Sequence, residues 1–505
     1  MPNTLYDALF EPHRGSARPY LVKPDGDVLT YDDFLKMAAR CAHAVKAAGV
    51  GPGDRIAVQI AKSPEALALY AASVQAGAVF LPLNTAYMPA EVEYFVGNAE
   101  PKLIVCDPAG KEALATIAKN AGAVLETLAG DGSGTLSEKA SGQPEAFETV
   151  ARGPDDLAAF LYTSGTTGRS KGAMLTHDNL LSNAETLKEV WRFSEDDRLL
   201  HALPIFHTHG LFVAVNTVTV AGGSMIWLPG FKTDAIIEHL PDATSMMGVP
   251  TFYTRLLDDA RFTRELVSHM RLFTSGSAPL LAETHVAFEE RTGHRILERY
   301  GMTETNMNTS NPYDGERRAG TVGFALPGVE LRICNPETGA KLAQGDIGVI
   351  EVRGPNVFKG YWQMPEKTRE EFRDDGFFIT GDLGKIDEDG YVHIVGRAKD
   401  LIISGGYNIY PKEVELLLDE QEGVLETAVI GIPHPDFGEA VVAAVVAQKD
   451  VSLEEADILE AIRDKIARFK QPKRLFVVDE LPRNTMGKVQ KNLLRDRFGR
   501  EFAAG

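Results

Sequence analysis

Glycines and hydroxyl side chains are concentrated in residues 162–172, whose sequence is YTSGTTGRSKG. The backbone N–H groups of glycines and the side-chain hydroxyls can donate to phosphate oxygens, and a lysine adds a positive charge. The spacing differs from the P-loop pattern G-x-x-x-x-G-K-[ST], because Gly165 and Gly168 are too close together and Gly172 follows Lys171. We therefore expect a phosphate-binding loop that is not a P-loop kinase motif; the alternative is a hydroxyl-rich surface turn.

Two later segments carry side chains suited to the rest of a nucleotide. In RYGMTET (299–305), the tyrosine can lie against a purine face, and Glu304 can hold Mg²⁺ together with phosphate oxygens. The alternative for this segment is a helix that begins at an N-cap, Thr303. In GFFITGDLG (376–384), Asp382 is an acceptor suited to ribose hydroxyls, although aspartate is also common in turns.

Two segments that supply lysine and arginine side chains follow toward the end of the chain. The first is GRAKDLIISGGYNIYPKEVE (396–415), and the second is LPRNTMGKVQK (481–491), in which Lys488 lies on a glycine-containing loop before an expected helix. By itself such a lysine indicates only a solvated surface charge. The first segment supplies Arg397, Lys399, Gly405 and Gly406.

The chain of 505 residues is too long for one hydrophobic core, so we expect more than one domain. Short apolar runs such as RIAVQI (55–60) alternate with helix-like stretches such as PEALALYAASVQAG (64–77), which indicates an α/β fold with layered, mostly parallel sheets. Near residue 396 the pattern changes to that of a small α+β domain. These patterns predict a large N-terminal domain over residues 1–397 and a C-terminal domain over 400–505.

Charge and cysteine usage limit the partners and the compartment. Asp plus Glu number 71 against 52 Lys plus Arg, so we expect no nucleic-acid or membrane partner. The three cysteines are isolated, which predicts no zinc site and favours a reducing compartment. The first residues lack a signal-peptide pattern, so a cytoplasmic protein is expected. The uncharged stretch 199–231 is interrupted by His, Gly and Pro, which predicts a buried strand–helix–strand passage rather than a membrane span.

In their order and separation, these five segments resemble those of the adenylate-forming acyl-CoA synthetase family, over essentially the whole chain. One departure is the sequence GRSKG, where the family usually has proline before the lysine; we expect only a local backbone effect. The resemblance implies a two-step reaction. A carboxylate attacks the α-phosphorus of ATP to give an acyl-adenylate and pyrophosphate, and the thiol of coenzyme A then attacks the acyl carbon and releases AMP. ATP, Mg²⁺ and coenzyme A are the implied cofactors and co-substrate.

The resemblance also implies roles for individual residues. Lys488 is the cation that bridges the carboxylate and the α-phosphate in the first step. Thr303 and Glu304 meet the phosphates and Mg²⁺, and Asp382 and Arg397 bind the ribose. The other implied ATP-binding positions are Thr163, Ser164, Gly165, Thr166, Thr167, Gly168, Lys171, Ser277, Ala278, Pro279, Glu298, Tyr300, Gly301 and Met302.

The C-terminal domain is implied to be a mobile lid. Its hinge is expected at residues 398–400, with Lys399 at the family's hinge position. Rotation between the two steps would replace Lys488 with the Gly405–Gly406 loop near the thioester centre. Acetylation of Lys488 would remove the charge needed in the first step, so a protein lysine acetyltransferase and a deacetylase are expected partners.

Arg299 is the residue that most informs the choice of acid. Many relatives that act on bulky or aromatic acids carry a small residue there, lining the acyl pocket; an arginine would shorten the pocket and offer a bidentate donor to a second carboxylate. His207, in LPIFHTHGL (203–211), and Ser277 could add polar contacts, and His209 is less clearly placed. The alternative is that Arg299 pairs with Glu298 or another acid.

A short dicarboxylate fits these residues, and in this the sequence resembles acyl-CoA synthetases that act on malonate. We therefore expect malonate as the substrate; methylmalonate stays open, since one methyl group changes discrimination by only about 1–3 kcal/mol. Other readings are a ligase for another short acid and an adenylation enzyme that loads a carrier protein. A luciferase-like oxygenase is disfavoured by Arg299, and a nucleotide-binding regulator without turnover by Lys488, Glu304 and Asp382.

Overall fold

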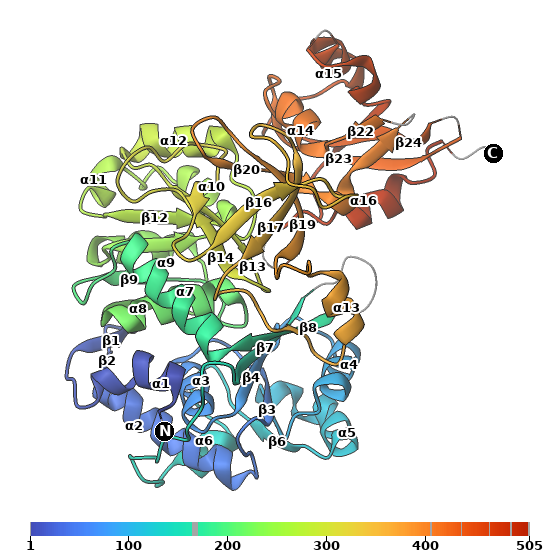
Figure 1. Ribbon diagram of the computed structural model, residues 1–505. Coiled ribbons are helices and arrows are strands. Elements are labelled where there is room, and N and C mark those ends of the chain that lie inside the picture. The colour runs from blue at the N-terminus through green and yellow to red at the C-terminus, as the bar shows by residue number, and fades with distance from the viewer. Residues whose placement is uncertain are drawn as a thin grey trace. The chain divides into compact units, whose positions relative to one another are not determined.

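The computed structural model describes residues 2–163, 170–404, 407–435, 437–463, 465–484 and 487–502. Contacts divide the chain into two compact units. Unit 1 comprises Met1–Glu330 and Val352–Phe378, and unit 2 comprises Leu331–Glu351 and Ile379–Gly505. The expected α/β class is confirmed, with large sheets in unit 1 and two smaller sheets, together with helices, in unit 2 (Figure 1). The expected boundary at 398–400 falls inside unit 2, so the hinge there stays a prediction.

The first sheet of unit 1 has nine strands, and its centre is parallel. The central strands are four-residue apolar runs that are buried along their whole length, as expected for parallel strands covered on both faces. In spatial order the strands are β15 (Phe324–Ala325), β14 (Asn306–Ser310), β13 (Leu297–Met302), β12 (Leu272–Ser275), β11 (Ser245–Gly248), β9 (Arg198–His201), β10 (Ser224–Trp227), β1 (Pro19–Val22) and β2 (Val28–Thr30).

The second sheet of unit 1 has seven strands and contains the runs expected from the sequence. In order they are β18 (Gly360–Tyr361), β8 (Lys171–Thr176), β7 (Leu157–Thr163), β4 (Val79–Pro82), β3 (Arg55–Gln59), β5 (Leu103–Cys106) and β6 (Val124–Thr127). The helix expected at 64–77 is α3 (Pro64–Gln75), which begins with Ser63 as N-cap and Pro64 in the first turn. Its residues from Ala66 to Gln75 are all buried, so α3 is a core helix.

The remaining helices of unit 1 lie against these sheets (Figure 1). Helix α7 (His177–Val190) begins with a capping box, in which the Thr176 hydroxyl accepts from Asn179 N and the Asn179 side chain accepts from Thr176 N. The others are α1 (Thr4–Leu9), α2 (Tyr31–Ala47), α4 (Pro89–Ala99), α5 (Lys111–Ala121), α6 (Thr135–Ala140), α8 (Asn216–Ala221), α9 (Thr233–His239), α10 (Pro250–Leu257), α11 (Arg264–Val267), α12 (Ala282–Thr292) and α13 (Pro365–Glu370).

The uncharged stretch 199–231 forms the buried passage that was expected. It runs from β9 through a π-helix (His209–Val215) and α8 into β10. Gly210 is required at the start of the π-helix, because a Cβ atom there would lie 2.0 Å from the carbonyl oxygen of Pro204. Among the described residues, no helix combines the length and the apolar character needed to span a bilayer.

Unit 2 contains two smaller sheets. One has the order β16 (Glu330–Cys334), β17 (Gly348–Arg353), β19 (Phe378–Ile386) and β20 (Val392–Arg397), of which the outermost residues Glu330, Val352, Arg353 and Phe378 belong to unit 1. The other has β22 (Tyr407–Ile409), β21 (Ile402–Ser404), β24 (Gly438–Ala447) and β23 (Val424–His434), with β25 (Arg474–Val478) parallel to β24. Its helices are α14 (Pro411–Asp419), α15 (Glu455–Ile462) and α16 (Lys491–Phe498).

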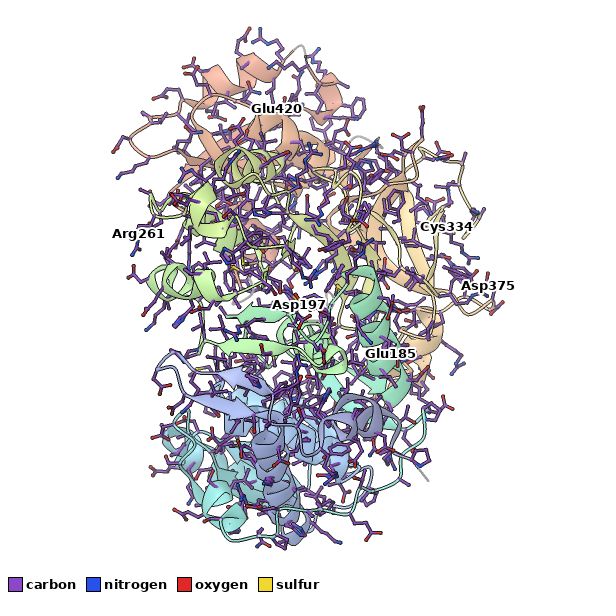
Figure 2. All side chains as sticks on the ribbon, turned by 90° about the vertical axis from the view of Figure 1, so that its left-hand side faces the viewer. Glu185, Asp197, Arg261, Cys334, Asp375 and Glu420 are labelled. Atoms are coloured by element: carbon purple, nitrogen blue, oxygen red, sulfur yellow. The ribbon has the colours of Figure 1, made fainter. Side chains whose placement is uncertain are left out.

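A buried ion pair fixes the start of β9. The Asp197 carboxylate accepts from Arg271 Nε at 2.5 Å, from the Thr244 hydroxyl at 2.8 Å and from Ser194 N at 2.8 Å. Asp197 is almost fully buried, whereas the Arg261–Asp234 pair is solvent-exposed (Figure 2 labels Asp197 and Arg261). Removing one member of a buried pair leaves an uncompensated charge, whereas exposed pairs contribute little.

We expect Asp197→Ala to destabilise unit 1 by about 3–5 kcal/mol, because Arg271 then loses its buried counterion. Asp234→Ala is the matched control and should cost at most about 1 kcal/mol. Urea unfolding followed by tryptophan fluorescence measures both variants. Equal shifts of the unfolding midpoint would contradict the distinction between the two pairs.

Candidate active site

The expected phosphate loop connects two antiparallel strands of the second sheet. Thr163, the last residue of β7, is in register with Lys171, the first residue of β8. The expected phosphate donors Ser164, Gly165, Thr166, Thr167 and Gly168 lie outside the described residues. The structure also explains the glycine after the lysine, because a Cβ atom at Gly172 would lie 2.2 Å from the ring of Phe160.

Lys171 belongs to a network of charged and hydroxyl groups in unit 1. Its ammonium lies 2.8 Å from Glu371 Oε1 and 4.0 Å from the centre of the Tyr361 ring. The Tyr361 hydroxyl lies 2.7 Å from Glu371 Oε2 and 3.0 Å from Glu304 Oε1. Burial and the two carboxylates raise the pKa of Tyr361, so the hydroxyl keeps its proton. The network joins the lysine of the phosphate loop to the carboxylate expected to hold Mg²⁺.

The segment 299–305 is a β-hairpin, and the alternative of a helix beginning at Thr303 is wrong. Strand β13 ends at Met302, a turn covers Thr303 to Thr305, and β14 begins at Asn306 with φ of 49°. Gly301 is needed inside this hairpin, because a Cβ atom there would lie 1.8 Å from Asn306 O. The hairpin leaves Glu304 buried in the turn, next to the Tyr361 hydroxyl.

The expected adenine and acyl contacts come from two neighbouring strands. Strands β12 and β13 are parallel and pair Ser275 with Glu298, so the residues that follow these two lie toward the same end of the two strands. Ser277, Ala278 and Pro279 follow β12, while Tyr300, Gly301 and Met302 end β13. Ser277 has φ of 72°, a left-handed conformation that costs about 1–3 kcal/mol for a residue other than glycine. Such strain is often found at ligand sites.

Arg299 is a buried cation on β13. Its side chain is covered, and its Nε and Nη2 atoms have no hydrogen-bond partner among the described residues. Glu298 does not pair with it; that carboxylate instead faces His285 Nδ1 at 3.3 Å and accepts from Gly320 N at 3.3 Å. Burial lowers the pKa of Arg299. The alternative in which Arg299 pairs with Glu298 is therefore wrong.

His209 is the histidine that the structure brings to Ser277. Its Nδ1 lies 3.2 Å from the Ser277 hydroxyl, and its Nε2 has no partner among the described residues. Desolvation, followed by the charge of Arg299, holds the pKa of His209 well below its usual range, so the ring is neutral. His207 contacts His209 through its Nδ1, which accepts from His209 N at 3.4 Å. Sequence spacing alone could not rank the two histidines, because a π-helix begins at His209, while His207 lies before it.

Within unit 2, the two residues expected to bind ribose are paired with each other. Asp382 on β19 is directly opposite Arg397 on β20, and Asp382 Oδ1 accepts from Arg397 Nε at 2.7 Å. Lys399 follows in the 3₁₀ turn Ala398–Asp400, and the carboxylate of Asp400 is held by Arg495 at 2.7 Å. The Gly405–Gly406 loop lies outside the described residues.

Lys488 is surrounded by charges of unit 2. The residue as a whole is exposed, but desolvation of its ammonium, followed by the positive charge of Arg397, lowers the pKa of Lys488 to about 8. Lys399 acts in the same direction, while Asp382 raises it. The loop is held by Asn484, whose side chain accepts from Lys488 N at 3.0 Å. This lysine therefore lies beside the residues expected to bind ribose.

Both parts of the chain match a single enzyme family. The AMP-binding enzyme description matches residues 11–362, and that of the AMP-binding enzyme C-terminal domain matches residues 413–488. The chain belongs to the AMP-binding enzyme family.

Particular relatives cover nearly the whole chain. It is 34% identical to malonate–CoA ligase of Arabidopsis thaliana, over 97% of this chain and 88% of that protein. It is 36% identical to feruloyl-CoA synthase of Amycolatopsis sp, over 96% and 97%. Among solved structures, ATP-bound MatB from Rhodopseudomonas palustris is 58% identical with a TM-score of 0.98, covering 99% of this chain and 100% of that one.

We expect the amine of Lys488 to react with acetic anhydride with a midpoint near pH 8. The pKa is lowered, so the reactive neutral form is populated at lower pH than in a free peptide of residues 481–491. Peptide mapping by mass spectrometry between pH 6.5 and 10 measures the midpoint. Lys399→Met removes a neighbouring positive charge and should raise it. A midpoint equal to that of the free peptide would contradict the effect of the surroundings.

Proposed function

We propose that this protein is an AMP-forming malonate–CoA ligase. It would convert malonate and ATP into malonyl-adenylate and pyrophosphate, and then transfer the malonyl group to coenzyme A with release of AMP. The observation that carries the choice of acid is Arg299, a buried guanidinium with two nitrogens that find no hydrogen-bond partner in the described part of the chain. Malonate–CoA ligase of Arabidopsis thaliana supports the same choice through its similarity over nearly the whole chain.

The physical reason is the cost of an unpaired buried charge. A guanidinium without a counterion in the protein interior is costly, and a substrate carboxylate can offset that cost with two charge-assisted hydrogen bonds. A monocarboxylate uses its only carboxylate for adenylation and leaves Arg299 unpaired. The neutral His209 and the Ser277 hydroxyl can add hydrogen bonds without adding charge. Whether methylmalonate is accepted depends on room for one methyl group.

Arg299 also limits the length of the acid. Its guanidinium fills the space beside Gly276, where a Cβ atom would lie 2.2 Å from Arg299 Nη1. A large aromatic acid, such as the one named for feruloyl-CoA synthase, would compete for this space. The geometry therefore favours a short dicarboxylic acid over a bulky one, and a ligase for another short acid is the second candidate.

The first step needs cations around the phosphates rather than a protein nucleophile. Lys171 would bind the leaving phosphates together with the hydroxyls of its loop, and Lys488 would stabilise the charge that develops at the α-phosphate. Glu304 fits a Mg²⁺ site, since it is a buried carboxylate in a turn and Mg²⁺ is usually held by one or two carboxylates and phosphate oxygens. When bound, the ion would neutralise phosphate charge.

The second step is assigned to a different arrangement of the C-terminal residues. We propose that residues 398–400 are the hinge, with Lys399 at its centre, and that the Gly405–Gly406 loop serves thioester formation with coenzyme A. The low pKa of Lys488 makes it a target for a protein lysine acetyltransferase, with a deacetylase to reverse the modification. Cys41, Cys106 and Cys334 are buried free thiols, which supports a reducing compartment such as the cytoplasm.

Arg299→Ala should lower kcat/KM for malonate by about 10²–10³-fold, because the second carboxylate loses its charged partner. The value for propionate should change little, so the preference between the two acids collapses. A coupled assay of AMP formation measures both substrates.

Arg295→Ala is the control for this change, since Arg295 lies nearby in sequence but is exposed and pairs with Glu289. If malonate turnover by Arg299→Ala stays near the wild-type value, the carboxylate anchor is excluded. A wild-type protein that forms AMP with another short acid and not with malonate would favour the second candidate.

Lys488→Ala should lower malonate-dependent ATP–pyrophosphate exchange by about 10²–10³-fold, as expected for loss of one donor to the developing charge. Transfer from chemically prepared malonyl-adenylate to coenzyme A should persist, since Lys488 is assigned only to the first step. Replacing coenzyme A by a carrier-protein thiol in the same assay tests the carrier-loading alternative. Equal loss in both half-reactions would show that Lys488 is not specific to the first step.

A further inference from the structure

Lys171 and Glu371 are 200 residues apart in sequence and form a partly buried ion pair. The ammonium that would bind phosphate is thus already neutralised by a carboxylate of the same unit. Glu371 directly follows α13, and both side chains are about four-fifths covered. An anion that approaches Lys171 must therefore either displace Glu371 from Lys171 or share Lys171 with Glu371.

The Tyr361 hydroxyl links this pair to Glu304. It lies within hydrogen-bond distance of both carboxylates, yet a phenol has one proton and can donate to only one of them at a time. When one carboxylate gains another partner, the Tyr361 hydroxyl is free to donate its hydrogen bond to the other carboxylate. The two contacts of Tyr361 therefore depend on each other.

The local charges indicate which exchange is favoured. Glu371 also lies 3.1 Å from the ammonium of Lys367, so it keeps one cation when Lys171 leaves. Glu304 would gain Mg²⁺ and then no longer need the Tyr361 proton. The Tyr361 hydroxyl can then donate its hydrogen bond to Glu371 alone, which replaces part of the stabilisation that Glu371 loses when Lys171 leaves. Binding of phosphate at Lys171 and of a cation at Glu304 would thus favour each other.

We propose that Glu371 is a positioning residue that holds Lys171 until a phosphate of the nucleotide takes the place of Glu371 at the ammonium. The Tyr361 hydroxyl couples this exchange to Glu304. This inference rests on the proposed ATP site. It assigns to Glu371 and Tyr361 a part in binding the phosphates, without contact to the reacting atoms.

The test compares Glu371→Gln with Glu370→Gln. Glu370 is the adjacent carboxylate, and its contact is with the exposed Lys367. Isothermal titration calorimetry measures the Kd of ATP in EDTA and in Mg²⁺. In EDTA, Glu371→Gln should bind ATP about tenfold more tightly than wild type, because phosphate no longer competes with a carboxylate for Lys171. Glu370→Gln should match wild type.

The second readout is the factor by which Mg²⁺ improves ATP binding. This factor should fall by about tenfold in Glu371→Gln and also in Tyr361→Phe. The second variant keeps the Lys171–Glu371 pair but has no hydroxyl to donate a hydrogen bond to either carboxylate. In EDTA, Tyr361→Phe should lack the tenfold gain in ATP affinity expected for Glu371→Gln, because the Lys171–Glu371 pair remains. These two variants separate competition at Lys171 from coupling to Glu304, and the second variant keeps the test valid if the first does not fold.

Unchanged binding of ATP in EDTA by folded Glu371→Gln would overturn the exchange at Lys171, and an unchanged Mg²⁺ factor in Tyr361→Phe would overturn the coupling. Wild-type protein that neither binds ATP nor releases pyrophosphate with malonate would instead refute the proposed function. The two failures are therefore distinguishable.

Discussion

The positive charge of Arg299, enclosed in unit 1, is the constraint around which the candidate acyl site is arranged. Its guanidinium occupies the space beside Gly276, and its charge contributes to keeping the ring of His209 neutral. A cation in this position is costly unless an anion joins it. The glycine at 276 accommodates the cation, and the next residue, Ser277, has a strained backbone.

At the candidate phosphate site the partly buried cation already has an anion. There the protein supplies its own anion, Glu371, to a lysine, and a single hydroxyl divides its proton between two carboxylates. On the proposed function, the first site would pair the Arg299 charge with a substrate carboxylate, and the second would release Lys171 from Glu371 to bind phosphate. Both sets of polar groups in unit 1 would then gain their final partners from the ligand.

Much of the fold could be predicted because it depends on local patterns. The apolar run RIAVQI became β3, the helix-like stretch 64–77 became α3, and the uncharged stretch became a buried passage. Arg299 could be singled out because many relatives in the family carry a small residue at this position. Tyr361 and Glu371 could not, since their importance comes from contacts with Lys171 and Glu304 that only tertiary folding creates. The hairpin at Thr303 was ambiguous because a hydroxyl followed by a carboxylate is also typical of helix starts.

The path of the chain between the two compact units has a consequence for how the protein can be divided. The backbone passes from one unit to the other three times, after Glu330, after Glu351 and after Phe378. A fragment that starts at residue 400 would therefore lack β16, β17, β19 and β20, and with them Asp382 and Arg397. A graft of the C-terminal segment onto a relative would likewise divide the charges around Lys488 between two parents. Exchange of the complete second unit requires three splice points, and its gene segment is not contiguous.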